Sequence, residues 1–164
     1  MTSGTGATTA GRPDLLDDRL CLALYTASRA RTARYRPELA ALGLTYPQYL
    51  VMVLLWEDGA ASVGQIGTRL RLESSTLSPL LKRLEAVGLV TRTRDGRDER
   101  SVTVEVTPAG RRVQERAAAI PDHMCQAVGL SAPGQAELVT ELRRLASRLE
   151  TSPTAASPGS VAHD

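Results

Sequence analysis

The sequence predicts a mainly α-helical protein that carries one small β ribbon. Along several stretches, apolar residues recur every three or four positions, as they do on the buried face of a helix. One stretch near the middle alternates apolar and polar residues on both sides of an Asp-Gly pair, which is the pattern of a hairpin. The length of 164 residues and the 42% hydrophobic content suit a single domain with a real core.

Two short helices joined by a turn are predicted in the middle of the chain. The first opens at Ser62, where Gln65 completes a capping box three residues later. The second opens near Ser74 and Ser75 and ends at Gly88, because glycine commonly terminates helices. Spacings of three and four give this second helix an inward face of Leu77, Leu80, Leu81, Leu84 and Val87.

An arginine-rich hairpin is predicted next, with its turn at Asp95-Gly96. Its strands alternate as Val90, Arg92 and Arg94, then Val102, Val104 and Val106. A helix with outward hydroxyls and cations, followed by such a hairpin, suits a DNA major groove and the adjacent backbone or minor groove. The candidate DNA contacts are Ser75, Thr76, Ser78, Pro79, Lys82, Arg83, Arg92, Arg94 and Arg97.

Residues 62–107 are therefore predicted to form a winged helix-turn-helix. The net charge of +2 is too small to indicate nucleic-acid binding by itself, but its distribution is informative. From Arg69 to Arg112 there are ten basic and six acidic residues, so positive charge is concentrated where phosphates would lie. The alternative is a helical subdomain of a small enzyme, whose cations are merely solvated.

Helices are also predicted before this region. One runs from Asp14, with Asp17 and Asp18 also in its first turns, and Pro37 limits its length. Its apolar stripe is Leu16, Leu20, Leu24 and Ala27. Another helix starts at the capping box of Thr45 and ends near Asp58-Gly59, carrying Tyr49, Leu50, Val53, Leu54 and Trp56.

Two more helices are predicted after the hairpin. One opens at Thr107-Pro108 and is kinked or broken at Pro121; its stripe is Val113, Ala117, Ile120, Met124 and Val128. The other follows Ser131 and carries Leu138, Leu142, Leu145 and Leu149. We interpret the helices of about 14–36 and 108–150 as a homodimer interface, the alternative being an intramolecular bundle.

The remaining segments define the expected limits of the domain. Residues 1–12 and 151–164 are small, polar and rich in Pro or Gly, which predicts disordered tails around one domain at 13–150. No apolar run approaches the roughly 20 residues of a membrane span, and the start has no apolar signal core. We therefore expect a cytoplasmic protein without membrane contact.

Every aromatic side chain of the sequence lies within 36 residues of Cys21: Tyr25, Tyr35, Tyr46, Tyr49 and Trp56. Tyr25 follows Cys21 by four residues and so shares its helical face. One interpretation is that the tyrosines pack in the core and Cys21 is a small buried hydrophobe. The other is a redox sensor, because hydroxyl donors aimed at a sulfur stabilise the reactive thiolate.

Cofactor and metal chemistry are not expected. The two cysteines, Cys21 and Cys125, argue against a structural disulfide framework. Neither His123 nor His163 completes a zinc ligand set with sensible spacing. We therefore predict no metal and no cofactor.

The segment DGRDERSVTVEVTPAG resembles the wing of the multiple-antibiotic-resistance regulator (MarR) family, whose pattern is roughly D-x-R-D-x-R, a hydrophobic strand and Thr-x-x-Gly. More narrowly, LCLALYTASRA, LGLTYPQYLVMVLLWE and STLSPLLKRLEAVGLVTR resemble the organic hydroperoxide resistance regulators (OhrR) of that family. The similarity runs from about Asp14 to Leu149. It implies a homodimeric winged-helix repressor, not an enzyme, which leaves a pseudo-palindromic operator when an organic hydroperoxide oxidises one cysteine.

The resemblance also implies roles for single residues. Cys21 matches the reactive cysteine, and Tyr35 and Tyr46 match the tyrosines that hydrogen-bond it, with Tyr25 nearby. The recognition helix corresponds to 75–87, and the wing arginine to Arg100, which Asp98 is positioned to hold. In two-cysteine members, a second cysteine on the partner subunit resolves the sulfenic acid as a disulfide, and Cys125 has that position.

Three other functions remain open on the sequence. A MarR-type repressor that binds a small phenolic ligand would need no thiol chemistry. A thiol peroxidase would turn over peroxide without DNA. A purely structural dimer would bind neither DNA nor peroxide.

Overall fold

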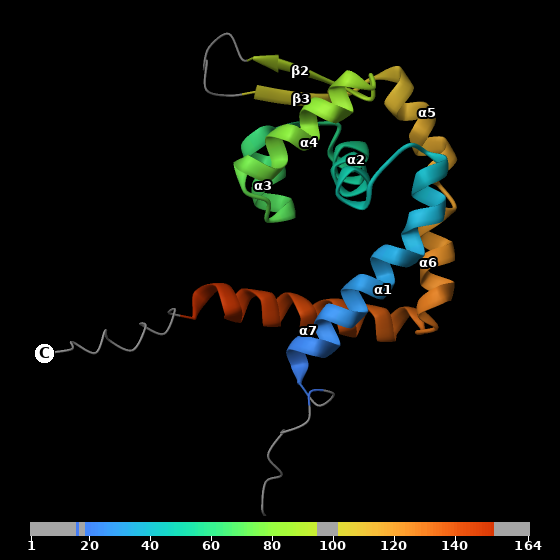
Figure 1. The fold of residues 1–164 in the computed structure, drawn as a ribbon, viewed down its shortest axis with the longest axis vertical. Helices are drawn as coiled ribbons and strands as arrows, with labels where there is room; N and C mark the ends of the chain where they lie inside the picture. The colour runs from blue at the N-terminus through green and yellow to red at the C-terminus, as the bar shows by residue number, and fades with distance from the viewer. Residues whose placement is uncertain (1–15, 17–18, 95–101, 153–164) are drawn as a thin grey trace, which may run out of the picture. The chain divides into compact units, whose positions relative to one another are not determined.

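The structure of the chain is a computed structural model that describes residues 16, 19–94 and 102–152 (Figure 1). Contacts divide the chain into two compact units, residues 1–124 and 125–164. The predicted tail of residues 1–12 and most of the tail of residues 151–164 lie outside the described residues, together with the first acidic turns expected at Asp14 and the hairpin turn at Asp95-Gly96. The helix expected from Asp14 begins only at Leu20, because the backbone of Arg19 is extended.

Seven helices and three short strands make up the described part of the chain, which confirms the predicted mainly α fold class with a small β wing. In chain order they are α1 (Leu20–Ala41), α2 (Tyr46–Asp58), β1 (Ala60–Ser62), α3 (Val63–Leu70), α4 (Ser74–Ala86), β2 (Val90–Arg94), β3 (Val102–Val106), α5 (Pro108–Ala117), α6 (Ile120–Val128) and α7 (Ala132–Thr151).

The sheet has three antiparallel strands in the order β1-β3-β2, rather than the two predicted from the hairpin pattern. β2 and β3 pair from Val90 opposite Val106 to Arg94 opposite Val102. β1 adds to the other edge of β3, with Ala61 opposite the fully buried Val104. The sequence did not indicate β1, because three residues are too few to show an alternating pattern.

Helix α4 has the inward face that its spacing predicts, with one exception. Leu77, Leu80, Leu81 and Leu84 are buried, whereas the prediction for Val87 is wrong because its side chain is 63% exposed. The helix ends at Ala86, so Val87 forms its C-cap and leaves the helical face. Gly88 then adopts a φ of 73°, which confirms it as the residue that terminates the helix.

Helix α1 is continuous through Pro37, which corrects the expectation that this proline limits the helix. A proline inside a helix loses one backbone hydrogen bond and crowds the preceding turn. The last turn nevertheless carries Leu39, whose side chain is only 1% exposed in the core. Tertiary packing of this kind outweighs the local cost of the proline.

Helix α2 is the centre of the core in the first unit. Val51, Met52 and Leu55 are fully buried, and the helix packs against α1, α3, α4, α5 and the sheet. Trp56 Nε1 donates a hydrogen bond of 3.2 Å to the carbonyl oxygen of Gly110, which fastens α2 to α5. The prediction for the start of α2 is also confirmed, because the backbone N–H of Thr45 donates to Gln48 Oε1 at 2.8 Å.

The predicted break near Pro121 is confirmed. α5 ends at Ala117 and α6 begins at Ile120, so Pro121 lies at the second position of a new helix, where its missing N–H costs little. Val113, Ala117, Ile120 and Met124 are buried as expected, whereas Val128 is 51% exposed.

Helix α7 of the second unit carries no buried residue. Its apolar side chains Leu138, Val139, Leu142 and Leu149 are each more than two-fifths exposed. No single helix in residues 16, 19–94 and 102–152 is long and apolar enough to cross a membrane. Within these same residues, only α1 and α2 taken together have the length and apolar composition of a membrane-spanning segment, and they are bent by 73° where they join.

Gly110 is a point of close approach, and its replacement gives a first test of the packing. A Cβ at this position would collide with the carbonyl oxygen of Leu89 and lie 2.7 Å from Val106 Cγ1. We expect Gly110→Ala to lower the free energy of unfolding by about 1–3 kcal/mol, because the rigid backbone must shift. Urea denaturation measures the change. Gly64→Ala is the matched control, since its Cβ meets only Ser62 Oγ at 3.9 Å. Equal stability of the two variants would contradict this packing.

Candidate functional site

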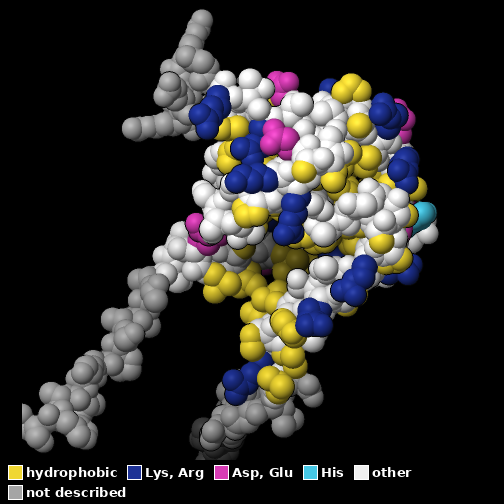
Figure 2. All heavy atoms as spheres, turned by 45° about the horizontal axis from the view of Figure 1, so that its top comes forward, with side chains coloured by type: hydrophobic (Ala, Val, Ile, Leu, Met, Phe, Trp, Pro, Cys, Tyr) yellow, Lys and Arg dark blue, Asp and Glu magenta, His cyan; other side chains and the backbone are white. Residues whose placement is uncertain are grey.

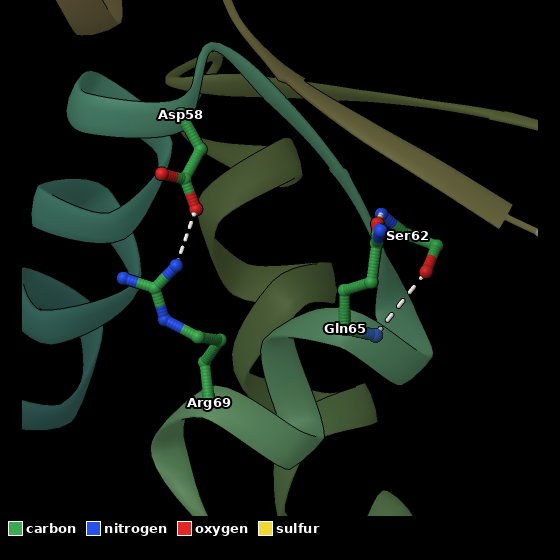
Figure 3. A network of polar contacts seen from close by, with 4 residues as sticks. All are labelled: Asp58, Ser62, Gln65 and Arg69. Atoms are coloured by element: carbon green, nitrogen blue, oxygen red, sulfur yellow. Dashed lines mark hydrogen bonds and ion pairs between the residues drawn. The ribbon is translucent and has the colours of Figure 1, made fainter.

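An ion pair and a capping box lie around the junction between α2 and α3 (Figure 3). Arg69 Nη1 lies 2.9 Å from Asp58 Oδ2, which joins the last turn of α3 to the last residue of α2. The Ser62–Gln65 capping box is confirmed: the Ser62 N–H donates to Gln65 Oε1 at 2.7 Å, and the Gln65 N–H donates to Ser62 Oγ at 3.1 Å. These contacts set the direction of α3, on which α4 packs.

The outer face of α4 displays most of the predicted DNA contacts. Ser78 is half-buried, and the exposed members are Ser75, Thr76, Pro79, Lys82 and Arg83. Glu73 is the N-cap residue of α4, and its side chain makes no capping hydrogen bond. Ser74 and Ser75 therefore lie inside the first turn of the helix. This arrangement gives one exposed stripe of hydroxyls and cations on a helix whose opposite face is buried.

The two described wing arginines differ. Arg94 is exposed, whereas the Arg92 side chain is only 24% exposed and its Nε lies 3.8 Å from Glu85 Oε2 of α4. Among the described residues, Arg92 Nε is a buried nitrogen without a hydrogen-bond partner. Arg92 therefore braces β2 against α4. The predicted contacts Arg97, Asp98 and Arg100 lie outside the described residues.

Three tyrosines form an aromatic cluster between α1 and α2. The Tyr35 ring lies 5.0 Å from that of Tyr46 and 5.7 Å from that of Tyr49, and Tyr49 contacts Trp56 edge-on at 6.1 Å. Burial raises the pKa of Tyr46, and the charge of Arg31 acts against this rise. Burial likewise raises the pKa of Tyr49, helped by the neighbouring phenols Tyr35 and Tyr46.

Cys21 lies in the first turn of α1, and its side chain is exposed. The interpretation that the tyrosines pack in the core holds for Tyr35 and Tyr49, which are buried. It does not hold for Tyr25, and Cys21 is not the buried hydrophobe that this interpretation expects. Within the described residues no hydrogen bond reaches Cys21 Sγ. Tyr25, one turn further along, is 57% exposed and accepts a hydrogen bond of 2.9 Å from Arg29 Nη1.

Within one chain, helix α1 separates the cluster tyrosines from Cys21. Tyr35 follows Cys21 by fourteen residues of uninterrupted helix, or about 21 Å along the axis. Tyr46 packs on Tyr35 and is therefore distant from this cysteine as well. A single subunit thus does not bring these two tyrosines to its own thiol.

Cys125 lies on α6 and is also exposed and unpaired with another cysteine. Its Sγ donates to Gln135 Oε1 at 3.4 Å, and Gln135 Nε2 donates to the carbonyl oxygen of Leu130 at 3.3 Å. Gln135 therefore ties the cysteine to the turn that precedes α7. In the described part of the chain, no three His, Cys, Asp or Glu side chains are grouped as a metal site.

A cavity of about 320 Å³ opens where α1 and α2 meet. No sequence pattern indicated it, because it forms from side chains of two helices and of the turn between them. Its lining combines apolar surface with a cation, hydroxyls and a phenol: Thr32, Arg36, Leu39, Ala40, Leu44, Thr45, Tyr46 and Pro47.

Comparison with known proteins places these features in a family. The MarR family pattern matches residues 44–102. The organic hydroperoxide resistance transcriptional regulator of Bacillus subtilis is 43% identical over 83% of this chain and 90% of its own length.

Solved structures agree with this assignment. Reduced AbfR bound to DNA, a Staphylococcus epidermidis protein, superposes with a TM-score of 0.70 at 33% identity, over 82% of this chain and 94% of that one. PcaV of Streptomyces coelicolor in complex with its natural ligand superposes with a TM-score of 0.73 at 25% identity, over 85% of this chain and 99% of that one. The chain therefore belongs to the MarR family of transcriptional regulators.

Proposed function

We propose that this protein is a homodimeric, peroxide-sensing repressor that leaves its operator when an organic hydroperoxide oxidises Cys21. The observation that carries the proposal is the exposed Cys21 thiol, one helical turn from the exposed phenol of Tyr25. The 43% identity to a regulator named for organic hydroperoxide resistance supports the same chemistry. We expect this regulator to act in the cytoplasm, with residues 13–150 as its domain.

The operator contacts of this proposal lie on α4 and the wing. Lys82, Arg83 and the hydroxyls of the first turn would face the major groove and its phosphates, and Arg94 would follow the adjacent backbone. The likeness to AbfR, which has been solved on DNA, supports this assignment. A symmetric dimer would present two such helices to major grooves about 34 Å apart, hence a pseudo-palindromic operator.

The exposed apolar surface supports the dimer. Figure 2 shows hydrophobic side chains gathered towards the N-terminal end of α1, where Leu16 is 62% and Leu20 is 59% exposed. α7 has a separate apolar face of its own. Because exposing a contiguous apolar surface to water is unfavourable, we infer that both faces pack on a second copy of the chain.

The dimer also supplies the tyrosines. Tyr35 lies about 21 Å along α1 from the Cys21 of its own chain, and Tyr46 packs on Tyr35, so we infer that both face the partner subunit's Cys21. Their hydroxyls would donate to the thiolate and stabilise it in a partly desolvated site. Tyr25 would approach from the same helix as the thiol.

The proposed oxidation proceeds in two balanced steps. The Cys21 thiolate attacks a peroxide oxygen, an S–O bond forms, the O–O bond breaks, and the alkoxide takes a proton and leaves as an alcohol. Cys125 of the partner subunit then attacks the sulfenic sulfur as a thiolate. An S–S bond forms, and hydroxide takes a proton and leaves as water. One peroxide is reduced per sensor site, without the continuous turnover that a thiol peroxidase would show.

A ligand-responsive regulator is the second candidate, and the cavity at the α1–α2 crossing favours it. Arg36 and Tyr46 offer a cation and a phenol beside the apolar Leu39, which suits a small phenolic acid. PcaV, the relative solved with its natural ligand, belongs to the same family. In this candidate the ligand would release DNA without any change at Cys21.

Fluorescence anisotropy on DNA from upstream of the protein's own gene tests the proposal. We expect the reduced protein to bind this DNA, cumene hydroperoxide to release it, and dithiothreitol to restore binding. A phenolic acid such as 4-hydroxybenzoate serves as the parallel arm. Release by the phenolic acid but not by the peroxide would replace the redox sensor with the ligand-responsive regulator. Absence of specific DNA binding at every salt concentration would exclude both.

A further inference from the structure

The proposed sensor uses three tyrosines: Tyr25, Tyr35 and Tyr46. Arg31 lies against the rings of the last two. Its guanidinium carbon lies 5.5 Å from the centre of the Tyr35 ring and 5.9 Å from the centre of the Tyr46 ring. These two rings are themselves 5.0 Å apart. A single cation on α1 therefore contacts one ring from its own helix and one from α2.

Both contacts are attractive, and the charge also acts on the hydroxyl of Tyr46. A guanidinium within about 6 Å of an aromatic ring centre is attracted to the electron-rich face, so Arg31 holds the two rings as one unit. A nearby positive charge also favours the phenolate over the phenol and makes the hydroxyl a stronger hydrogen-bond donor. The charge acts against the burial that raises the pKa of Tyr46.

A second arginine makes a similar contact with the third tyrosine. Arg29 lies 5.5 Å from the centre of the Tyr25 ring, and its Nη1 donates to Tyr25 Oη at 2.9 Å. The Tyr25 oxygen is thus occupied as an acceptor, while its hydrogen remains available to a sulfur acceptor. Each of the three candidate thiolate-stabilising phenols therefore has an arginine against its ring.

We propose that Arg31 is a positioning residue for peroxide sensing, which holds Tyr35 and Tyr46 together and strengthens the Tyr46 hydroxyl as a donor to the partner subunit's Cys21 thiolate. The proposal rests on the proposed peroxide-sensing function. Arg31 itself is exposed, and the proposal gives it no direct contact with the peroxide or the sulfur. It acts through the two phenols, so removing its charge should slow oxidation without abolishing it.

Tyrosine titration tests the first half of this proposal. We would follow the Tyr46 resonance by NMR in protein with 13C-labelled tyrosine, in wild type, Arg31→Met and Arg31→Lys. The midpoint should move to higher pH in Arg31→Met and return most of the way in Arg31→Lys, because lysine restores the positive charge and methionine does not. Arg34→Met is the matched control, an exposed arginine of the same helix without a ring contact among the described residues. Its Tyr46 midpoint should equal that of wild type.

Oxidation kinetics test the second half. In a Cys125→Ser background, we expect Arg31→Met to slow formation of the Cys21 sulfenic acid by about two- to fivefold, the factor that a cation–ring contact at an exposed site carries. Arg31→Lys should recover most of the rate, and Arg34→Met should keep all of it. Circular dichroism and reduced-state DNA affinity should be unchanged in each variant.

Every outcome bears on the proposal. A shifted Tyr46 titration with an unchanged oxidation rate would overturn it, because Arg31 would tune phenols that do not serve the thiol. An unshifted titration, or equal slowing by Arg34→Met, would overturn it as well. Failure of the sensor function itself is distinguishable, since wild-type protein would then show no peroxide-dependent loss of DNA binding.

Discussion

Operator affinity should fall about a hundredfold or more when Lys82 and Arg83 are both replaced with alanine. Both side chains are exposed on α4, on the side away from its buried leucines. A hydrogen bond that involves a charged group contributes about 1.5–3 kcal/mol, and two such contacts per subunit would be lost. Because both cations would also displace counterions from DNA, the slope of log affinity against log salt should become shallower by about 2 for each subunit. Anisotropy titrations over a series of salt concentrations measure both quantities.

The control for this prediction is a second adjacent pair of exposed cations. Arg111 and Arg112 lie on α5 outside the proposed DNA contacts, so their double alanine variant loses the same charge. We expect it to keep most of the affinity and of the salt slope. Equal losses in the two double variants would mean that general charge, and not the face of α4, binds the operator.

The elements around α4 could be predicted because their signals are local. Ser62 with Gln65, and Gly88 at a positive φ, mark helix ends through contacts within four residues. Thr45 with Gln48 does the same for α2. The apolar spacing of α4 then follows from the geometry of a helix that is buried on one side.

The features that the sequence did not predict depend on contacts between distant segments. β1 exists because it pairs with β3, more than forty residues later. α1 continues through Pro37 because Leu39 is buried in the core formed with α2. The spacing predicted Val87 as part of the apolar stripe of α4. The helix ends at Ala86, however, so Val87 is exposed.

The same distinction applies to the candidate site. Cys21, Tyr35 and Tyr46 were selected by a family resemblance, and their spacing in the sequence says nothing of which subunit each serves. Tyr35 is distant from the Cys21 of its own chain because α1 is one continuous helix between them. The position of Arg31 over Tyr46 joins residues of different helices, so no local pattern could have indicated it.

The Cys21→Ser variant should remain on the operator at every peroxide dose that releases wild-type protein. Serine preserves the size of the side chain but has no sulfur that a peroxide can oxidise, so reduced-state affinity should be unchanged. Cys125→Ser provides the control: we expect it to form the Cys21 sulfenic acid but no intersubunit disulfide on a non-reducing gel. Release of Cys21→Ser by cumene hydroperoxide at the wild-type dose would refute the thiol mechanism.

Mixed dimers that contain one Cys21→Ser subunit test which subunit supplies the tyrosines. A Tyr35→Phe homodimer should oxidise about tenfold or more slowly, because each thiolate loses a phenol donor. In a dimer of one Tyr35→Phe subunit and one Cys21→Ser subunit, purified through two different tags, the single Cys21 belongs to the chain with Phe at position 35. If the partner supplies Tyr35, this thiol still has its donor and should react at the wild-type rate per site. A rate as slow as that of the Tyr35→Phe homodimer would show that the tyrosine acts within its own chain, which the length of α1 makes incompatible with the present helix.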